Sequence, residues 1–116
     1  MNIEILRHYC LSKKEVTESF PFDETTLVFK VAEKIFALTS LEGELRINLK
    51  CNPIKAIDLR EKHYSIIPGY HMNKKHWNTV IVNGELDQSQ LFELIDHSYD
   101  LVIKSLPKYK QKGLFE

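Results

Sequence analysis

Residues 66 to 82 read IIPGYHMNKKHWNTVIV, the densest group of polar and aromatic side chains in the sequence. This stretch contains the single Trp, two of the five His and two adjacent Lys. Pro68-Gly69 is typical of a tight turn, in which we expect Gly69 to supply a positive φ. The run from Trp77 to Val82 predicts a strand, because β-branched residues dominate it. The polar residues therefore precede the strand directly.

The segments on either side of this stretch predict two helices. Asn52-Pro53 is a strong helix start, an N-cap followed by proline at the first helical position, and the helix should run to about Lys62. Its buried side is predicted from the residues Ile54, Ala56, Ile57 and Leu59. His63 to Met72 is predicted as loop. After a turn at Asn83-Gly84, Asp87 caps a long helix with Gln90 as its reciprocal partner, and Pro107 closes that helix.

The clearest alternation in the chain runs from Leu45 to Cys51 and predicts a half-buried strand. Its apolar residues face a core, while Arg46, Asn48 and Lys50 share the opposite face. Two further strands are predicted over residues 26–31 and 34–40, and the first places Lys30 on its polar side. The connections among these three strands are too short for crossovers, which predicts an antiparallel meander.

The N-terminal part predicts two helices in succession. Asn2 can cap a first helix that reaches about Leu11, and Ser12 to Glu15 has the pattern of a capping box that begins a second. The second helix should end at Phe20-Pro21-Phe22, because proline cannot continue it. We expect the two aromatic residues of that tripeptide to fill the core beside a sheet edge.

Length and composition indicate one domain, which we place at residues 1–107, followed by a frayed tail at residues 108–116. No apolar run approaches the roughly 20 residues that a membrane-spanning helix needs. Cys10 and Cys51 form no metal-type pair, which favours two free thiols in a cytoplasmic protein. We expect a monomer.

Charge is balanced overall but uneven along the chain. The 16 basic and 16 acidic side chains give a net charge of +0. Residues 46–84 carry 7 basic and 2 acidic side chains, a local excess of +5, whereas residues 85–103 carry 5 acidic and none basic. The basic block includes the central stretch, which hints at an anionic partner.

Several chemistries are disfavoured by the residue patterns. The four glycines are scattered, so they predict no glycine-rich phosphate loop, and no Cys-x-x-Cys or His-Glu-x-x-His motif is present. His71 and His76 are five residues apart, which places them on opposite faces of a strand and disfavours a shared metal. We therefore expect a non-catalytic protein without a cofactor or metal.

The central stretch has two interpretations. In the first, it is a structured loop anchored by Tyr70 and Trp77. Asn73 caps a turn within this loop, and the two lysines are solvated. In the second, it is a binding surface, because an aromatic ring beside ammonium groups suits an anionic or planar partner. If the helices cover one face of the sheet, Arg46, Asn48, Lys50 and Lys30 lie on the open face beside it.

The sequence resembles the MmcQ/YjbR family along most of its length. The similarity includes Phe20-Pro21-Phe22, residues 26–30 and 49–53, the specific run from Pro68 to Thr79, Asp96-His97-Ser98-Tyr99 and Ser105-Leu106-Pro107. The resemblance implies a frataxin-like (CyaY-like, double-wing) fold: an α+β two-layer sandwich with helices on one face of an antiparallel sheet. The family is labelled DNA-binding. Frataxins bind iron at an acidic ridge on their first helix, whereas only Glu4 lies in that helix here.

Resemblance and residue pattern together define a candidate binding surface. Its members are Lys30, Arg46, Lys50, Tyr70, His71, Asn73, Lys74, Lys75, His76, Trp77 and Thr79. The first hypothesis is weak DNA binding without sequence preference through the open sheet face. The alternative is a module that binds a protein or a small anionic ligand beside Tyr70, Trp77 and Lys50. An enzyme ranks third, because no nucleophile–base pair is visible.

Overall fold

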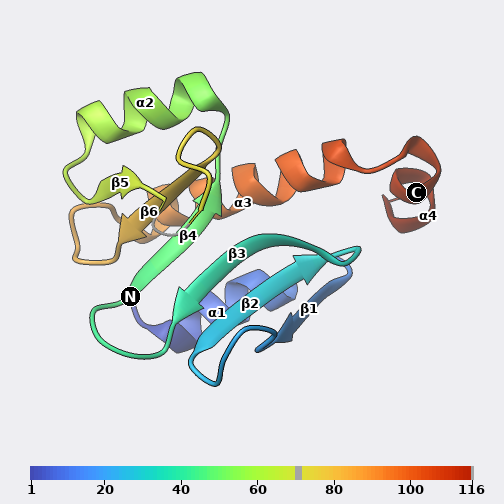
Figure 1. Cartoon of the computed structure of the whole chain (residues 1–116), viewed down its shortest axis with the longest axis horizontal. Helices are drawn as coiled ribbons and strands as arrows, with labels where there is room; N and C mark the ends of the chain where they lie inside the picture. Colours follow the sequence, from blue (N-terminus) through green and yellow to red (C-terminus); the bar gives the residue numbers. More distant parts are fainter. Residues whose placement is uncertain (70–71, 116) are drawn as a thin grey trace.

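An open six-stranded antiparallel sheet forms the framework of the chain, and helices lie on one face of it (Figure 1). The computed structural model describes residues 1–69 and 72–115. The elements are α1 (Ile3–Ser12), β1 (Val16–Ser19), β2 (Thr26–Val31), β3 (Lys34–Ser40), β4 (Arg46–Lys50), α2 (Pro53–Lys62), β5 (Ile66–Pro68), β6 (Trp77–Ile81), α3 (Gln88–Ser105) and α4 (Lys108–Phe115). The strand order is β1-β2-β3-β4-β6-β5. The predicted α+β class and antiparallel sheet are confirmed.

The core lies between the sheet and the helices α1 and α3. Alternate residues of the inner strands point toward the helices, and Phe29, Phe36 and Ile47 are fully buried there. From the helices, Leu6 of α1 and Ile95 of α3 meet them. The predicted burial of the β4 residues Ile47 and Leu49 is confirmed, while Leu45, just before β4, is partly buried at the margin.

The Ser98 hydroxyl of α3 links β3 to β4 where the two strands separate. The β3–β4 register runs from Thr39/Ile47 to Ala37/Leu49 and ends there. One step further, the fully buried Ser98 Oγ donates to the carbonyl of Phe36 and accepts the N–H of Lys50 (2.9 Å). Ser98 thus satisfies two backbone groups that would otherwise be buried without partners.

Two neighbours of Ser98 join α3 to the N-terminal segment. The Asp96 carboxylate accepts a hydrogen bond from the Tyr9 hydroxyl (2.6 Å) and forms an ion pair with Lys13. The Tyr99 hydroxyl donates to the backbone carbonyl of Lys14 (2.6 Å). Successive residues of α3 therefore fix both the sheet and the end of α1.

The second N-terminal helix predicted from Ser12 is wrong, because residues 16–19 form the strand β1. The Ser12 hydroxyl donates to the carbonyl of Tyr9 instead of capping a new helix, and Glu15 has a φ of +63°. The β-branched Val16 and Thr17 then pair with Val31 and Lys30 of β2. Cross-strand pairing has overridden the local capping pattern.

The buried side predicted for α2 is partly wrong. Ala56 is buried and Leu59 packs against the core, but Ile54 is 81% exposed and Ile57 is 53% exposed. The aromatic residues beside Pro21 are also exposed, Phe20 at 46% and Phe22 at 65%, so they do not fill the core.

Two further segments differ from expectation. Residues 66–68, predicted as loop, form the edge strand β5, in which Pro68 is tolerated because an edge strand has one free side. The predicted frayed tail contains α4, whose first turn forms on the carbonyl of Pro107 and whose Gln111 amide donates to the carbonyl of Leu106 (2.7 Å). Among the described residues, no helix is long and apolar enough to cross a membrane.

Ile95→Ala should lower the free energy of unfolding by about 2–5 kcal/mol, because it leaves a cavity beneath a side chain that is 0% exposed. Ile54→Ala is the matched control: it removes the same atoms from a side chain that is 81% exposed, and the change should stay within about 0.5 kcal/mol. Urea denaturation measures both. Equal losses at the two sites would show that the helix faces are assigned incorrectly.

Candidate functional site

The open face of the sheet, opposite the helices, brings Lys50 and Trp77 side by side. In the antiparallel register of β4 and β6, Lys50 pairs with Trp77, Asn48 with Thr79 and Arg46 with Ile81. Directly paired residues project to the same face of a sheet. These side chains therefore lie on the face opposite the buried Ile47 and Leu49. Trp77 is partly buried.

Lys30 belongs to the same end of the open face. Phe29, Ala37, Leu49 and Asn78 form one paired row across four strands, on the helix side of the sheet. Lys30, Lys50 and Trp77 each lie one residue beyond that row, in the same direction and on the opposite face. Ile35, which pairs with Lys30, completes a line that we call the transverse strip: Lys30, Ile35, Lys50 and Trp77.

The open face is basic because the strands contain a single carboxylate, which points the other way. Glu18 is the single acidic residue within the six described strands, and it pairs with Phe29 on the helix side. Its carboxylate binds the Arg7 guanidinium of α1. Arg46 is less available than the lysines, since Glu44 holds it at 3.0 Å. Among the described residues, the strand cations of the open face without an ion pair are therefore Lys30 and Lys50, both partly buried.

The middle of the open face is densely packed. The next row runs through Val28, Leu38, Asn48 and Thr79, of which Val28 and Thr79 are almost fully buried. The Thr79 hydroxyl donates to the Asn48 side-chain carbonyl. Thr79 is therefore buried within this face and does not present its side chain to a ligand, whereas the sequence predicted it as a binding residue. The alternation of β4 had already put Asn48 on this face.

The turn before Trp77 is a structured unit that presents two lysines. The Asn73 backbone carbonyl accepts the N–H groups of His76 (3.2 Å) and Trp77 (2.9 Å), and its side chain accepts the N–H of Lys75 (2.9 Å). Arg60 of α2 donates to the carbonyl of Lys74 (3.3 Å). This geometry agrees with the predicted capping role of Asn73. Lys74 and Lys75 are exposed beside Trp77.

The other predicted residues of this stretch are placed differently. The partly buried His76 acts here through its backbone carbonyl, which accepts the N–H of Cys51 (2.7 Å) and joins the turn to β4. Tyr70 and His71 lie outside the described residues, so their place in the candidate surface stays a prediction.

Gly69 is required for a close approach, and the positive φ predicted for it is wrong. Its backbone N–H donates to the carbonyl of Trp77 (2.8 Å), and a Cβ at this position would lie 2.7 Å from Trp77 Cβ and 2.9 Å from that carbonyl oxygen. Positive φ angles occur instead at Gly43 and Gly84. The side chain of Trp77 is thus set by a backbone contact that only glycine permits.

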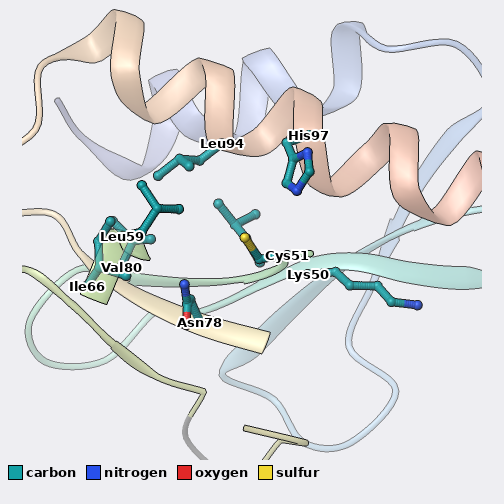
Figure 2. A pocket seen from close by; sticks show the side chains of 9 residues that line it. Lys50, Cys51, Leu59, Ile66, Asn78, Val80, Leu94 and His97 are labelled. Atoms are coloured by element: carbon teal, nitrogen blue, oxygen red, sulfur yellow. The ribbon is translucent and has the colours of Figure 1, made fainter. Parts of the chain in front are cut away.

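A small apolar pocket lies on the helix side of the same strands (Figure 2). Its lining includes Cys51, Leu59, Ile66, Val80, Leu94 and His97, and its space suits about one water molecule. Figure 2 shows the Lys50 side chain extending away from it. Asn78, 3% exposed, donates weakly to the carbonyl of Ala56 (3.4 Å), and its Oδ1 has no partner among the described residues.

Burial shifts the pKa values of His97 and Cys51, two ionisable groups at this pocket, in the direction that favours their neutral forms. Burial, followed by the charge of Lys55, lowers the pKa of His97, and its Nε2 accepts the N–H of Asn52 (3.2 Å). Burial also raises the pKa of the Cys51 thiol, which makes it a poor nucleophile. The pocket is therefore part of the packing between α2, α3 and the sheet, and the binding candidates remain on the open face.

A serine, a histidine and a glutamate meet at the start of β5, but they do not form a triad. The Glu85 carboxylate accepts hydrogen bonds from the Ser65 hydroxyl (2.6 Å) and amide (3.2 Å), and its other oxygen lies 2.6 Å from His63 Nδ1. A triad needs the hydroxyl to face the imidazole. Here the carboxylate is the centre, and it joins the end of α2 to the turn after β6.

Glu85→Gln should lower the free energy of unfolding at pH 6, and the difference from the unmodified protein should shrink toward pH 3. The Ser65 hydroxyl, with His63, holds the pKa of Glu85 below its usual value of 4.5. A depressed pKa contributes stability above the usual value, and that stability is lost as the pH falls through the folded-state pKa. Exposed Glu93→Gln is the control; a pH-independent difference for Glu85→Gln would contradict the assignment.

Gly69→Ala should destabilise the fold by about 1–3 kcal/mol, as overpacking does, and should shift the emission of the single Trp. Gly113→Ala in α4 is the control, because a Cβ there meets nothing within 4 Å and alanine favours helix. Thermal unfolding and intrinsic fluorescence measure the two effects. An unchanged melting temperature for Gly69→Ala would refute the close approach to Trp77.

Known proteins share both the sequence and the structure. The family model described as YjbR matches residues 11–101. The chain is 35% identical to uncharacterized protein YjbR of Escherichia coli K12, over all of this chain and 99% of that protein. It is 41% identical to uncharacterized protein YbdF of E. coli O157:H7, over 94% of this chain and 90% of that protein.

Solved structures agree with this assignment. The crystal structure of Deinococcus radiodurans protein DR2400 superposes with a TM-score of 0.92 at 41% identity, over 97% of this chain and 86% of that one. A Pseudomonas syringae protein superposes with a TM-score of 0.75 at 31% identity, over 87% of this chain and 98% of that one. On these grounds, the chain belongs to the YjbR family.

Proposed function

We propose that this protein binds nucleic acid, weakly and without reading its sequence, through the open face of the sheet. One observation supports this most: Lys50 and the Lys74-Lys75 turn flank Trp77, and Lys30 lies further along the same face, to which no strand contributes a carboxylate. Positive charge gathered on one face attracts a polyanion even when the net charge of the chain is zero.

The lack of sequence readout follows from what the helices expose. Reading bases in a duplex requires an element that enters the major groove with donors and acceptors. The exposed side of α3 carries Glu93 and Asp100, which repel phosphate. The exposed side of α2 combines apolar residues with charges of both signs: Ile54, Lys55, Ile57, Asp58, Glu61 and Lys62. The lysines of the open face reach phosphates, which position a protein without specifying a sequence.

The function is proposed to be binding without catalysis, in the cytoplasm. Cys10 and Cys51 are both free and buried, as expected of thiols in a reducing compartment. The second candidate function is recognition of a small anionic ligand or a protein at the same surface. The direct Lys50–Trp77 pair favours it, because one ammonium group beside one aromatic ring can hold a single anionic, planar group.

The binding should be salt-sensitive, with log affinity against log salt sloping at about −3, as expected for three or four phosphate contacts. Replacing Lys74 and Lys75 with alanine should weaken binding and flatten the slope by up to about two units. The control replaces Lys55 of α2 and Lys104 of α3, which are also exposed but lie near His97 on the helix side of the sheet. Fluorescence anisotropy with labelled duplex and single-stranded oligonucleotides measures these values.

Two outcomes would contradict the proposed function. One is the absence of binding to either form of nucleic acid at low salt, which would leave the small-ligand or protein candidate. The other is an equal loss of affinity in the Lys55 and Lys104 control, which would show that Lys74 and Lys75 contribute only general positive charge and do not belong to a defined binding surface.

A further inference from the structure

We propose that the ligand of the open face is a single-stranded oligonucleotide, in which a base stacks on Trp77 and the flanking phosphates contact lysines of the transverse strip and the Lys74-Lys75 turn. This inference rests on the nucleic-acid binding proposed above and narrows it to one form of the polymer. It follows from the order of apolar and cationic groups across the sheet.

Cations stand on both sides of the aromatic ring. Lys75 and Lys74 precede Trp77 by two and three residues in a turn fixed by Asn73, and Lys50 lies directly across from Trp77 on β4. Lys30 lies on β2, three strands from β6 and across the point where β3 and β4 separate. A chain that crosses the strands along this line would meet cation, ring, cation and cation in turn.

The spaces between these cations are apolar, as bases require. Ile35, on β3, comes between Lys30 and Lys50 in strand order, and the buried Val28 and Leu38 form the next row of the same face. Bases can lie on such a surface only when their faces are uncovered, as in a single strand. In a duplex the bases are stacked on each other, so that Trp77 and Ile35 would gain no contact from them.

The platform is also rigid enough to orient the ring. Gly69 lies against the Trp77 backbone, the Thr79–Asn48 hydrogen bond joins the two strands below it, and Ser98 fixes the backbone of Lys50 from the other side. Binding a ligand should therefore require little further ordering of the strands around Trp77. A preorganised aromatic platform with flanking cations is the arrangement by which sheet proteins hold single strands.

The test compares oligo(dT), oligo(U) and a duplex of equal length by anisotropy at low salt. In the unmodified protein, the single strand should bind more tightly than the duplex and should quench the fluorescence of the single Trp. Trp77→Leu should weaken single-strand binding about five-fold or more, and Trp77→Phe should retain most of it. Neither variant should change duplex binding more than about two-fold.

The outcomes separate the inference from the proposed function. Tighter duplex binding, or single-strand binding without quenching, would overturn the inference while nucleic-acid binding stands. No binding of any of the three would overturn both. Quenching is read in the unmodified protein, so the inference remains testable even if Trp77→Leu does not fold. A preference for oligo(dT) or for oligo(U) would identify DNA or RNA as the source of the strand.

Discussion

The hydroxyl of Ser98 holds together the two halves of the sheet. It donates to the Phe36 carbonyl of β3 and accepts the Lys50 N–H of β4, where the direct ladder between those strands has ended. Beyond that point β4 runs with β6, and the strands visibly diverge (Figure 1). Two buried backbone groups without partners would each cost about 1–3 kcal/mol. The strand separation is thus possible because α3 supplies a hydroxyl at that position.

This constraint has a consequence on the other side of the sheet. Because the Lys50 backbone is bonded to α3, its side chain is directed to the open face beside Trp77, while Leu49 and Cys51 turn toward the helices. The same alternation separates charge within the strands: Glu18 lies on the helix side, whereas Lys30 and Lys50 lie on the open face. A chain with a net charge of +0 can therefore present a basic surface.

Much of this arrangement could be predicted from local patterns. The alternation of residues 45–51 correctly placed Lys50 opposite the core, and the capping box of Asp87 and Gln90 is present in α3. The failures share one cause, which is long-range contact. Residues 16–19 form a strand because β2 offers an edge, and residues 66–68 do so because β6 is beside them. No pattern within either segment could show that partner.

The candidate site could also be predicted only as far as patterns within single strands allow. Periodicity within β4 and β6 gave each strand two faces, but which face of β6 joins Lys50 depends on a register set by hydrogen bonds across the sheet. The irregularity at Phe29/Lys30, which skips Phe36 and pairs Lys30 with Ile35, has no sequence signal. The sequence predicts a positive φ at Gly69, because Pro-Gly usually marks a turn. The structure instead requires glycine there because Trp77 lies too close for a side chain.

The central claim, that the open face is the binding surface, is tested most directly by nuclear magnetic resonance. A ¹⁵N-labelled sample would be titrated with a short single-stranded oligonucleotide. The account predicts shift changes at the amides of Lys30, Asn48, Lys50 and Lys75 and at the Trp77 indole, with α1 and the exposed side of α3 unaffected. Changes confined to α2 or α4, with the strands of the open face unchanged, would contradict it.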